Sequence, residues 1–314
     1  GEPGIIFVDK GTGVGTNLTI TNSQSPVGGH ITGADGLDAT STSPAGVGGA
    51  GITADAGADT CTLKIDDGVT VTAGTGGDGY NADGKRDGGA GGAGIDNSSA
   101  GITSVEVSGG SVTGGNGGNG ADTTDGVTPA GIGGAGGVGI SSTPAAVTGG
   151  NVLGGNGGNG GSASGAAPGG VGGAGGNAAA EGTTVSGGST TGGNGGNGGF
   201  SETGNGGAGG DAGKKVSGDV SGSDGLRGLP GVPAGFIAGY DEDGNVVVTL
   251  IDESQITIPI IIPDTWSDVT LDLGGKTIKG ADGTSDSPNG KPALIITNAD
   301  GSGVNLTITN GELI

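Results

Sequence analysis

An acidic stretch in the C-terminal part of the chain carries the side chains best suited to bind a ligand. In "DEDGNVVVTLID", Asp241, Asp243, Asn245 and Asp252 put oxygen-bearing side chains at places 1, 3, 5 and 12 of a loop, which are ligand places of an EF-hand calcium loop. Val246 stands where the EF-hand has Gly, and place 12 holds Asp where the EF-hand has Glu. The stretch therefore predicts either a loose Ca²⁺ site or, as we favour, a β-turn joining "FIAGY" to "NVVVTLI".

Other reactive side chains are sparse. His30 is the only histidine, so a histidine-based triad or zinc site has no set of partners. Cys61, the only cysteine, lies in the strand-like run "TCTLKI" and is expected to be a small buried hydrophobe. The glycine runs lack the Lys-Ser/Thr that follows a phosphate-binding loop. We predict no catalytic site and no cofactor other than Ca²⁺, for which acidic loops of the second repeat are a further candidate.

The charge of the chain limits its partners. The 314 residues carry a net charge of −22, which repels phosphate backbones and anionic lipid, so a nucleic-acid partner is not expected. No run approaches the ~20 apolar residues of a membrane span, and we expect no membrane insertion. The chain begins at Gly1 and contains no Met. This favours either removal of a leader, with an extracellular or cell-surface location, or a piece cut from a longer polypeptide.

Glycine triplets dominate the middle of the chain. Glycine accounts for 86 residues, and "GGNGGNG" recurs within 113–120, 153–160 and 191–198. About six repeats of 31–43 residues each run from a Val/Ser/Thr strand into Gly-Gly-Asn, through a loop of variable length, and back through Gly-Gly-Ala. Constant segments joined by variable loops are typical of a solenoid.

The triplets explain why so much glycine is compatible with order. Glycine can form an extended threefold helix like polyproline II while keeping its N–H, so neighbouring helices can pack closely and bond through their backbones. We expect the Asn and Ala at every third place to point the same way along one face. The pattern resembles the polyglycine-II bundles of the snow-flea antifreeze protein and of phage tail-fibre tips.

The two ends of the chain are richer in β-forming residues. "LDLGGKTIKG" and "VNLTITNGELI" resemble coils of right-handed parallel β-helices of the pectate-lyase type, and "GIIFVDKGTGVGTNLTITNSQS" matches them at the N-terminus. We therefore predict an all-β fold with almost no α-helix, a right-handed parallel β-helix or solenoid with a central polyglycine-II-like region. Its parts are an N-terminal coil (1–26), the glycine-rich repeats (27–225) and C-terminal coils (226–314).

Near copies of one sequence occur towards opposite ends of the chain. "GTGVGTNLTITN" (11–22) resembles "GSGVNLTITN" (301–310), and neither end carries a recognisable solenoid cap. A repeat protein cut short is one interpretation. Head-to-tail association with another copy is the other, and an interface that does not close into a ring gives a filament. The predicted assembly residues are Gly11, Asn17, Leu18, Ile20, Asn305, Leu306, Ile308, Leu313 and Ile314.

These observations favour a non-catalytic extracellular structural protein, a homopolymeric subunit of a filament, sheath or matrix. The first alternative is an adhesin or phage-fibre-type module that binds a cell surface or glycan through its variable loops. Candidate binding residues in those loops are Asp78, Asp83, Arg86, Asp122, Asp125, Phe200 and Glu202. The second alternative is an ice-binding protein that presents a regular Thr/Asn/Ala face.

Overall fold

The chain forms a parallel β-solenoid of about six turns in which 1% of the residues are helical, as the sequence predicts. In the computed structural model the described residues are 1–7, 16–21, 28–54, 61–81, 86–98, 101–141, 145–202, 205–255, 259–262, 266, 268–281, 290–296 and 305–314. Within them, no helix is long and apolar enough to cross a membrane.

Three parallel sheets enclose the first core. Sheet A contains β1 (Ile5–Phe7), β4 (Ile52–Ala54) and β7 (Ile95–Asp96) in that order. Sheet B has the order β12 (Thr184–Val185), β10 (Ala145–Val147), β8 (Ile102–Val107), β5 (Cys61–Ile65) and β2 (Thr16–Ile20). Sheet C has the order β13 (Ser189–Thr191), β11 (Asn151–Leu153), β9 (Ser111–Thr113), β6 (Val69–Thr72) and β3 (Gly29–Thr32). Each of the first five coils contributes one strand, or an isolated bridge, to each sheet, and Ser223 adds a bridge to sheet C beyond β13.

The strands form where β-branched residues alternate with polar ones, so that every second side chain points inward. Leu63 and Ile65 of β5 are buried and pair in register with Leu18 and Ile20 of β2. The same apolar places are thus stacked on one another from coil to coil. Cys61 is buried in β5, which confirms the prediction for it, and burial raises the pKa of its thiol.

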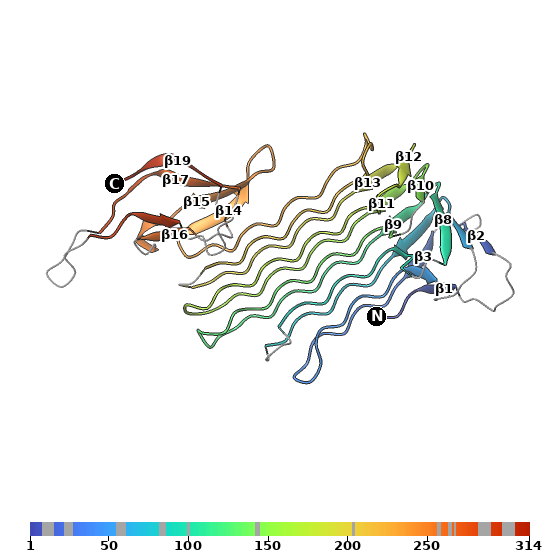
Figure 1. Cartoon of the computed structure of the whole chain (residues 1–314), viewed down its shortest axis with the longest axis horizontal. Coiled ribbons are helices and arrows are strands. Elements are labelled where there is room, and N and C mark those ends of the chain that lie inside the picture. The colour runs from blue at the N-terminus through green and yellow to red at the C-terminus, as the bar shows by residue number, and fades with distance from the viewer. Residues whose placement is uncertain are drawn as a thin grey trace.

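Glycine-rich arms extend away from the three sheets (Figure 1). Each coil leaves sheet C along an outgoing arm, turns in a tip loop, and comes back to sheet A along a return arm. In one coil, residues 114–120 form the outgoing arm and residues 131–139 the return arm. The arms of successive coils lie side by side, and together they build a slab two layers thick.

Backbone hydrogen bonds connect each arm to neighbours in both layers. The N–H of Gly157 donates to Asn194 O of the next outgoing arm at 2.8 Å, and the N–H of Gly158 donates to Gly134 O of a return arm at 2.8 Å. Gly158 O in turn accepts from the N–H of Gly173 in its own coil's return arm. The slab therefore satisfies its interior peptide groups without an apolar core, as the triplet pattern predicts.

Only glycine fits the two interior places of each triplet. A Cβ on Gly118 would lie 2.0 Å from Gly77 O, and one on Gly158 would lie 1.9 Å from Gly118 O. These contacts are with backbone atoms, which cannot move aside as the end of a flexible side chain can. Glycine is required here by close packing, since neither residue has a positive φ.

The third residue of each triplet points out of the slab, and the structure here differs from the single face expected. Because outgoing and return arms form opposite layers, Asn lies on one face and Ala on the other. On the outgoing face, the Oδ1 of Asn119 accepts from the N–H of Asn159 at 3.0 Å, and the Oδ1 of Asn159 accepts from the N–H of Asn197 at 2.9 Å. Each side chain thus caps the outward N–H of the next coil.

A buried carboxylate closes sheet C after β13. Asp219 is 4% exposed, and its Oδ2 accepts from the backbone N–H and the Oγ1 of Thr190 at 2.7 and 2.6 Å. Its Oδ1 accepts from the N–H and the hydroxyl of Ser221. Burial opposes ionisation, yet these hydrogen bonds outweigh it and hold the pKa of Asp219 well below its usual range. The carboxylate accepts from Thr190 at the edge of sheet C, next to the parallel bridge between Thr191 and Ser223.

The C-terminal coils lie at the opposite end of the arms from sheets A, B and C (Figure 1). The last outgoing arm, 225–231, bonds to the preceding return arm through the N–H of Gly231 and Gly207 O. It leads into a sheet with the order β14 (Phe236–Tyr240), β15 (Val246–Leu250), β17 (Val269–Ile278) and β19 (Leu306–Leu313). The 3-10 helix η1 (Glu253–Gln255) and the pair β16 (Ile260–Ile262) and β18 (Leu294–Ile296) complete this unit. Trp266 and Phe236 meet edge to face in its core, with ring centroids 6.1 Å apart.

The close approach of the arms predicts the effect of a single methyl group. Gly118→Ala should lower the free energy of unfolding by about 3 kcal/mol, because a backbone carbonyl lies where the Cβ must go. Gly239→Ala is the matched control, since a Cβ there has no heavy atom within 4 Å, and it should stay within about 1 kcal/mol of wild type. Chemical denaturation of both variants measures the difference, and equal stabilities would contradict the packing described here.

The cap at Asp219 predicts an acid-sensitive stability. Asp219→Ala should lower the free energy of unfolding by about 1–3 kcal/mol, because it leaves buried donors of Thr190 without an acceptor. Since the folded pKa is lowered, the contribution of Asp219 is complete above the unfolded pKa of about 3.9 and is lost as the pH falls through the folded value. Denaturation of wild type and variant at pH 7 and pH 2.5 should give a smaller difference at the lower pH. A difference independent of pH would exclude this role.

Candidate functional site

The two near-identical sequence segments lie in strands at the edges of their sheets. β2 contains "TNLTI" and is the outermost strand of sheet B, where it pairs with β5. β19 contains "LTITNGEL" and is the outermost strand of the C-terminal sheet, where it pairs with β17. Both pairings are parallel and in each case the other edge has no strand partner among the described residues. The two segments thus present free strand edges at opposite ends of the solenoid.

The first coil leaves the core between the three sheets open. Leu18, Ile20 and Ile31 pack against this core but remain only partly buried, as does Ile5. The corresponding apolar residues of the following coils are buried, for example Leu63 at 2% exposure. Among the described residues, no further coil covers these four side chains as the next coil covers an interior position.

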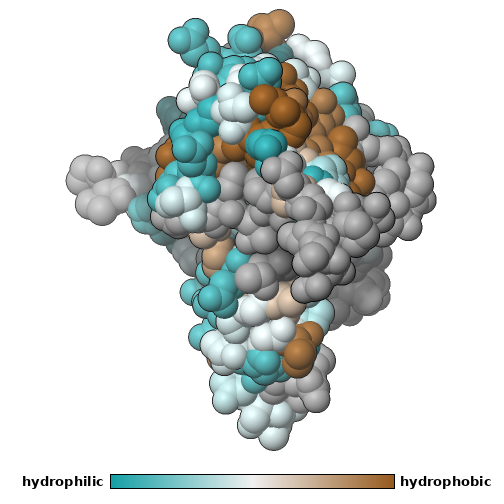
Figure 2. Space-filling model, turned by 90° about the vertical axis from the view of Figure 1, so that its left-hand side faces the viewer, coloured by the Kyte–Doolittle hydropathy of each residue, from teal (hydrophilic) through white to brown (hydrophobic). Residues whose placement is uncertain are grey.

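The last coil is open in the same way. Leu294 and Leu306 are partly buried against the C-terminal core, while Ile296 and Ile308 are 50% and 38% exposed. Figure 2, which looks at the molecule from the side of the C-terminal coils, shows hydrophobic side chains gathered there. A row of exposed apolar side chains next to a free strand edge is a surface on which a further strand can pair.

The similarity between the first and last coils extends beyond the shared "NLTITN" segment. β1 precedes β2 as β18 precedes β19, and "IIF" of β1 matches "LII" of β18. β1 and β18 also have a single strand neighbour each within the described residues, β4 and β16. The first and last coils therefore share two strands of one design. Counted back from the shared "NLTITN", β18 lies one residue nearer than β1 does, and this offset makes the match hard to see in the sequence alone.

Most predicted assembly residues fall on these two edges. Leu18 and Ile20 lie in β2, and Leu306, Ile308 and Leu313 lie in β19. Ile314 follows β19, and its N–H donates to Ile278 O at 2.9 Å. The Nδ2 of Asn305 donates to Asp268 Oδ1 at 2.8 Å. Gly11 lies outside the described residues, and Asn17 is described only as part of the backbone of β2.

The predicted binding residues lie in the tip loops or beside them. Asp78 and Asp122 belong to the capping rows of the outgoing face, where their Oδ1 atoms accept from the N–H of Asn119 and of Ser162 at 2.7 Å each. The hydroxyl and N–H of Thr128, with the N–H of Val127, lower the pKa of Asp125 to about 2. Asp125 thus stabilises its own turn. Asp83 lies outside the described residues.

Successive tip loops are stacked along one edge of the slab. Thr123, Ala163 and Ser201 form parallel bridges, and the Oε2 of Glu202 accepts from the N–H of Gly165 at 2.9 Å. Phe200 is 39% exposed at this edge. The loops that differ most between repeats are thus brought together on one side of the molecule.

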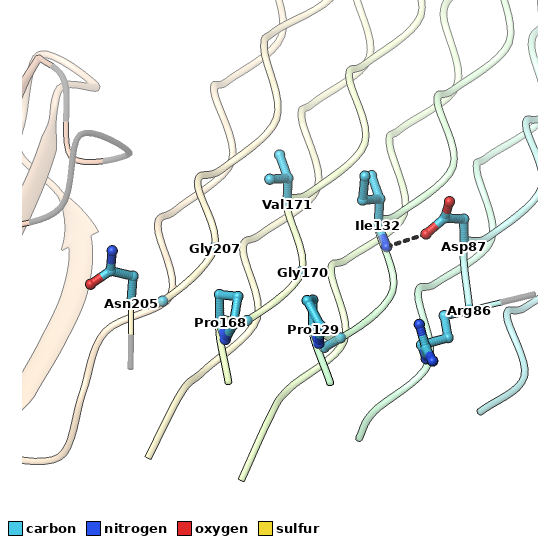
Figure 3. Close-up of a pocket in the computed structure, with 12 residues that line it drawn as sticks. Arg86, Asp87, Pro129, Ile132, Pro168, Gly170, Val171, Asn205 and Gly207 are labelled. Carbon is cyan, nitrogen blue, oxygen red and sulfur yellow. Dashed lines mark hydrogen bonds between the residues drawn. The ribbon is translucent and has the colours of Figure 1, made fainter. Parts of the chain in front are cut away.

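A shallow depression of about 490 Å³ lies on the return arms next to these tips. Pro129, Pro168 and Asn205 line it from three successive coils, and Arg86 borders it (Figure 3). The Oδ1 of Asp87 accepts from the N–H of Ile132 at 2.9 Å, as drawn in Figure 3. Sequence reasoning identified Arg86, but the prolines that shape the hollow carry no signal of binding.

The calcium candidates form the turn that the sequence favours. Asp241 stands between β14 and β15, which pair as an antiparallel hairpin, and this confirms the predicted β-turn. Its Oδ1 accepts from the N–H of Asp243 and of Asn245 at 3.0 and 2.8 Å, and its Oδ2 accepts from Asn245 Nδ2. Asp252 follows the far end of β15, where its Oδ1 accepts from Ser254. Across the described residues there is no group of three or more His, Cys, Asp and Glu side chains placed to hold a metal.

Comparisons with protein-family models, with curated proteins and with solved structures gave no match.

The hydrogen bonds of Asp241 predict the outcome of a metal titration. The side chain and the N–H of Asn245 lower the pKa of Asp241, and both oxygens serve the turn. Asp241→Ala should therefore lower the melting temperature equally in EDTA and in 1 mM Ca²⁺, with Asp243→Ala as control. A stabilisation by Ca²⁺ that is present in wild type and lost in Asp241→Ala would instead establish the calcium site.

Proposed function

We propose that the protein is a non-catalytic structural subunit that polymerises head to tail into an extracellular filament, sheath or matrix. In this assembly the last coil of one subunit, β18 and β19, stacks on the first coil of the next, β1 and β2. The observation that carries the proposal is that two copies of one coil design occupy free edges at opposite ends of the stack. The extracellular setting is an expectation from the sequence.

The register inside the solenoid indicates how such a joint would be built. Ile308 pairs with Leu271 in β17, and Leu18 pairs with Leu63 in β5, so at both ends apolar places stack on apolar places. Placing β19 beside β2 of another copy in the same phase brings Leu306 and Ile308 over Leu18 and Ile20. The joint would add parallel strand hydrogen bonds and cover both open cores.

The joint also has a direction. The chain advances from β2 to β5 to β8, and from β17 to β19, so stacking β2 on β19 continues the same sense of advance. Such a contact uses two different surfaces and is heterologous, and it propagates without limit unless the rotation closes a ring. This property favours a filament over a dimer.

The position of the C-terminal coils gives the filament a sideways step. The first coil lies at the strand end of the arms and the last coil at their tip end (Figure 1). The outgoing arm 192–199 has a length of roughly 25 Å at ~3.1 Å per residue. Each subunit would therefore be displaced by about one arm length, and the filament axis would be inclined to the axis of coil stacking.

The resemblance of the end coils to pectate-lyase-type β-helices is part of the same proposal. The bend of β17 between Asp272 and Lys276, where Gly274 and Gly275 have positive φ, turns one strand into two legs of a coil. This geometry supports a relationship of the end coils to pectate-lyase-type β-helices. The chemistry of the described surfaces supports a non-catalytic function, because the carboxylates at the tips are engaged as backbone caps.

An adhesin remains the second candidate function, and one observation favours it. The variable tip loops are stacked along a single edge, where Tyr80, Val127 and Phe200 are 47%, 80% and 39% exposed. Apolar and aromatic side chains on variable loops are typical of a binding surface. A glycan array or cell-binding assay with the monomeric protein would test this function separately from assembly.

A charged side chain at the joint should block polymerisation. Ile308→Lys places an ammonium group in the interface with β2 while its own strand stays paired with β17, so it should leave monomers at concentrations where wild type forms filaments. Thr307→Lys is the matched control, because its side chain lies on the opposite face of β19, and it should still polymerise. Negative-stain electron microscopy over a concentration series measures the outcome.

The melting temperature of each variant is the control for folding. A value equal to that of wild type shows that a variant without filaments is still folded. Wild-type protein that remains monodisperse at every concentration would contradict the proposed function. Filaments of Ile308→Lys equal to those of wild type would show that the joint lies elsewhere.

A further inference from the structure

The face of the slab built by the return arms is mainly apolar, and Asp87, Asn177, Asn205 and Asp211 are its polar places. Its third-place side chains line up across coils, because the N–H of Gly91 donates to Ala135 O and the N–H of Gly136 donates to Ala174 O, at 2.9 and 2.8 Å. Ala90, Ala135 and Ala174 thus form one column. Ile132, Val171 and Ala208 form a second, through the N–H groups of Gly133 and Gly172. Figure 3 shows Ile132 and Val171 projecting from the same side of the arms.

The opposite face of the slab is polar, so the slab is amphipathic. There the corresponding places carry Asn156, Asn159, Asn194 and Asn197, whose Oδ1 atoms cap backbone N–H groups of the next coil. The apolar face does without such caps over most of its area, and Val47 and Ile132 are 56% and 48% exposed on it. Exposed apolar area of this regularity marks an interaction surface.

We propose that this apolar face packs against the same face of a second copy, so that two filaments pair back to back. The inference rests on the proposed filament. A net charge of −22 disfavours anionic membranes and nucleic acid as occupants. A second copy carries the same charge, so pairing of two filaments should strengthen as salt screens the repulsion between them. A flat grid of small side chains with fixed column spacing is matched by an identical grid, which has the same period in both directions.

The size of the face explains why pairing requires the filament. A third column runs through Ala93 and Val138. Three columns ~9 Å apart and about four coils ~4.8 Å apart cover roughly 500 Å² per copy. A stable two-protein interface needs about 800 Å² per partner, so isolated subunits would not pair through this face alone. In a filament the faces of successive subunits act together, and binding at one subunit raises the effective concentration at the next.

The structure itself indicates a substitution that charges this face without unfolding the slab. Asp87 stands at a third place of the second return arm, where its Oδ1 accepts from the N–H of Ile132 at 2.9 Å. An Asp at position 135 or 174 points outward in the same way and can accept from the next coil. The double variant Ala135→Asp/Ala174→Asp therefore adds two charges to the apolar face. Asn156→Asp/Asn194→Asp adds the same charge to the polar face and keeps the Oδ1 caps.

Cryo-electron microscopy of assembled wild type and both double variants tests the proposal. Wild type and Asn156→Asp/Asn194→Asp should give fibres two slabs thick, and Ala135→Asp/Ala174→Asp should give single filaments of half that thickness with the same axial repeat. Single wild-type filaments, or paired filaments of Ala135→Asp/Ala174→Asp, would overturn lateral pairing. The head-to-tail joint would still be supported, because filaments form. Absence of filaments from all three chains would overturn the proposed function, and the pairing with it.

Discussion

The structure depends on how closely two peptide backbones can approach when neither carries a side chain. At Gly118 and Gly158 the position of a Cβ is already taken by a carbonyl oxygen about 2 Å away, so each interior place of the slab admits glycine alone. This approach lets every arm exchange hydrogen bonds with neighbours in two layers. Glycine loses more conformational freedom on folding than other residues. In the arms this loss is offset by a dense set of backbone hydrogen bonds, which hold the slab together in place of an apolar core.

The outward place of each triplet then determines what each face can do. On the outgoing face, Asn119 and Asn159 accept from the N–H groups of the following coil, which holds the register of the arms and uses the face for stability. On the return face, Ala135 and Ala174 leave their N–H groups without an acceptor among the described residues. That face stays mainly apolar, and it is the surface that we propose for contact with another copy. The same period therefore produces a structural face and a candidate interaction face.

The sequence predicts the local design better than the arrangement in space. Triplet periodicity indicates stacked glycine helices, alternating β-branched residues indicate the strands, and the Asp241 turn follows from its turn-forming residues. The separation of Asn and Ala onto opposite faces depends on how each tip loop reverses the chain, which no local pattern encodes. The same applies to Asp219, whose partner Thr190 is 29 residues away, and to the placement of the C-terminal coils at the tip end. The similarity of β1 and β18 is hard to detect in the sequence, because both strands are short and their spacings from the shared "NLTITN" segment differ.

Residue-resolved amide hydrogen exchange of the monomer tests the backbone lattice most directly. We expect slow exchange at interior glycines such as Gly117 and Gly158 and at the capped N–H of Asn159, and fast exchange at Ala135 and Ala174 in the same slab. A pattern with a three-residue period on the return arms, and continuous protection on the outgoing arms, would establish the arrangement of hydrogen bonds. Exchange of the interior glycines as fast as that of Ala135 would contradict it, because the arms would then not be held by their backbones.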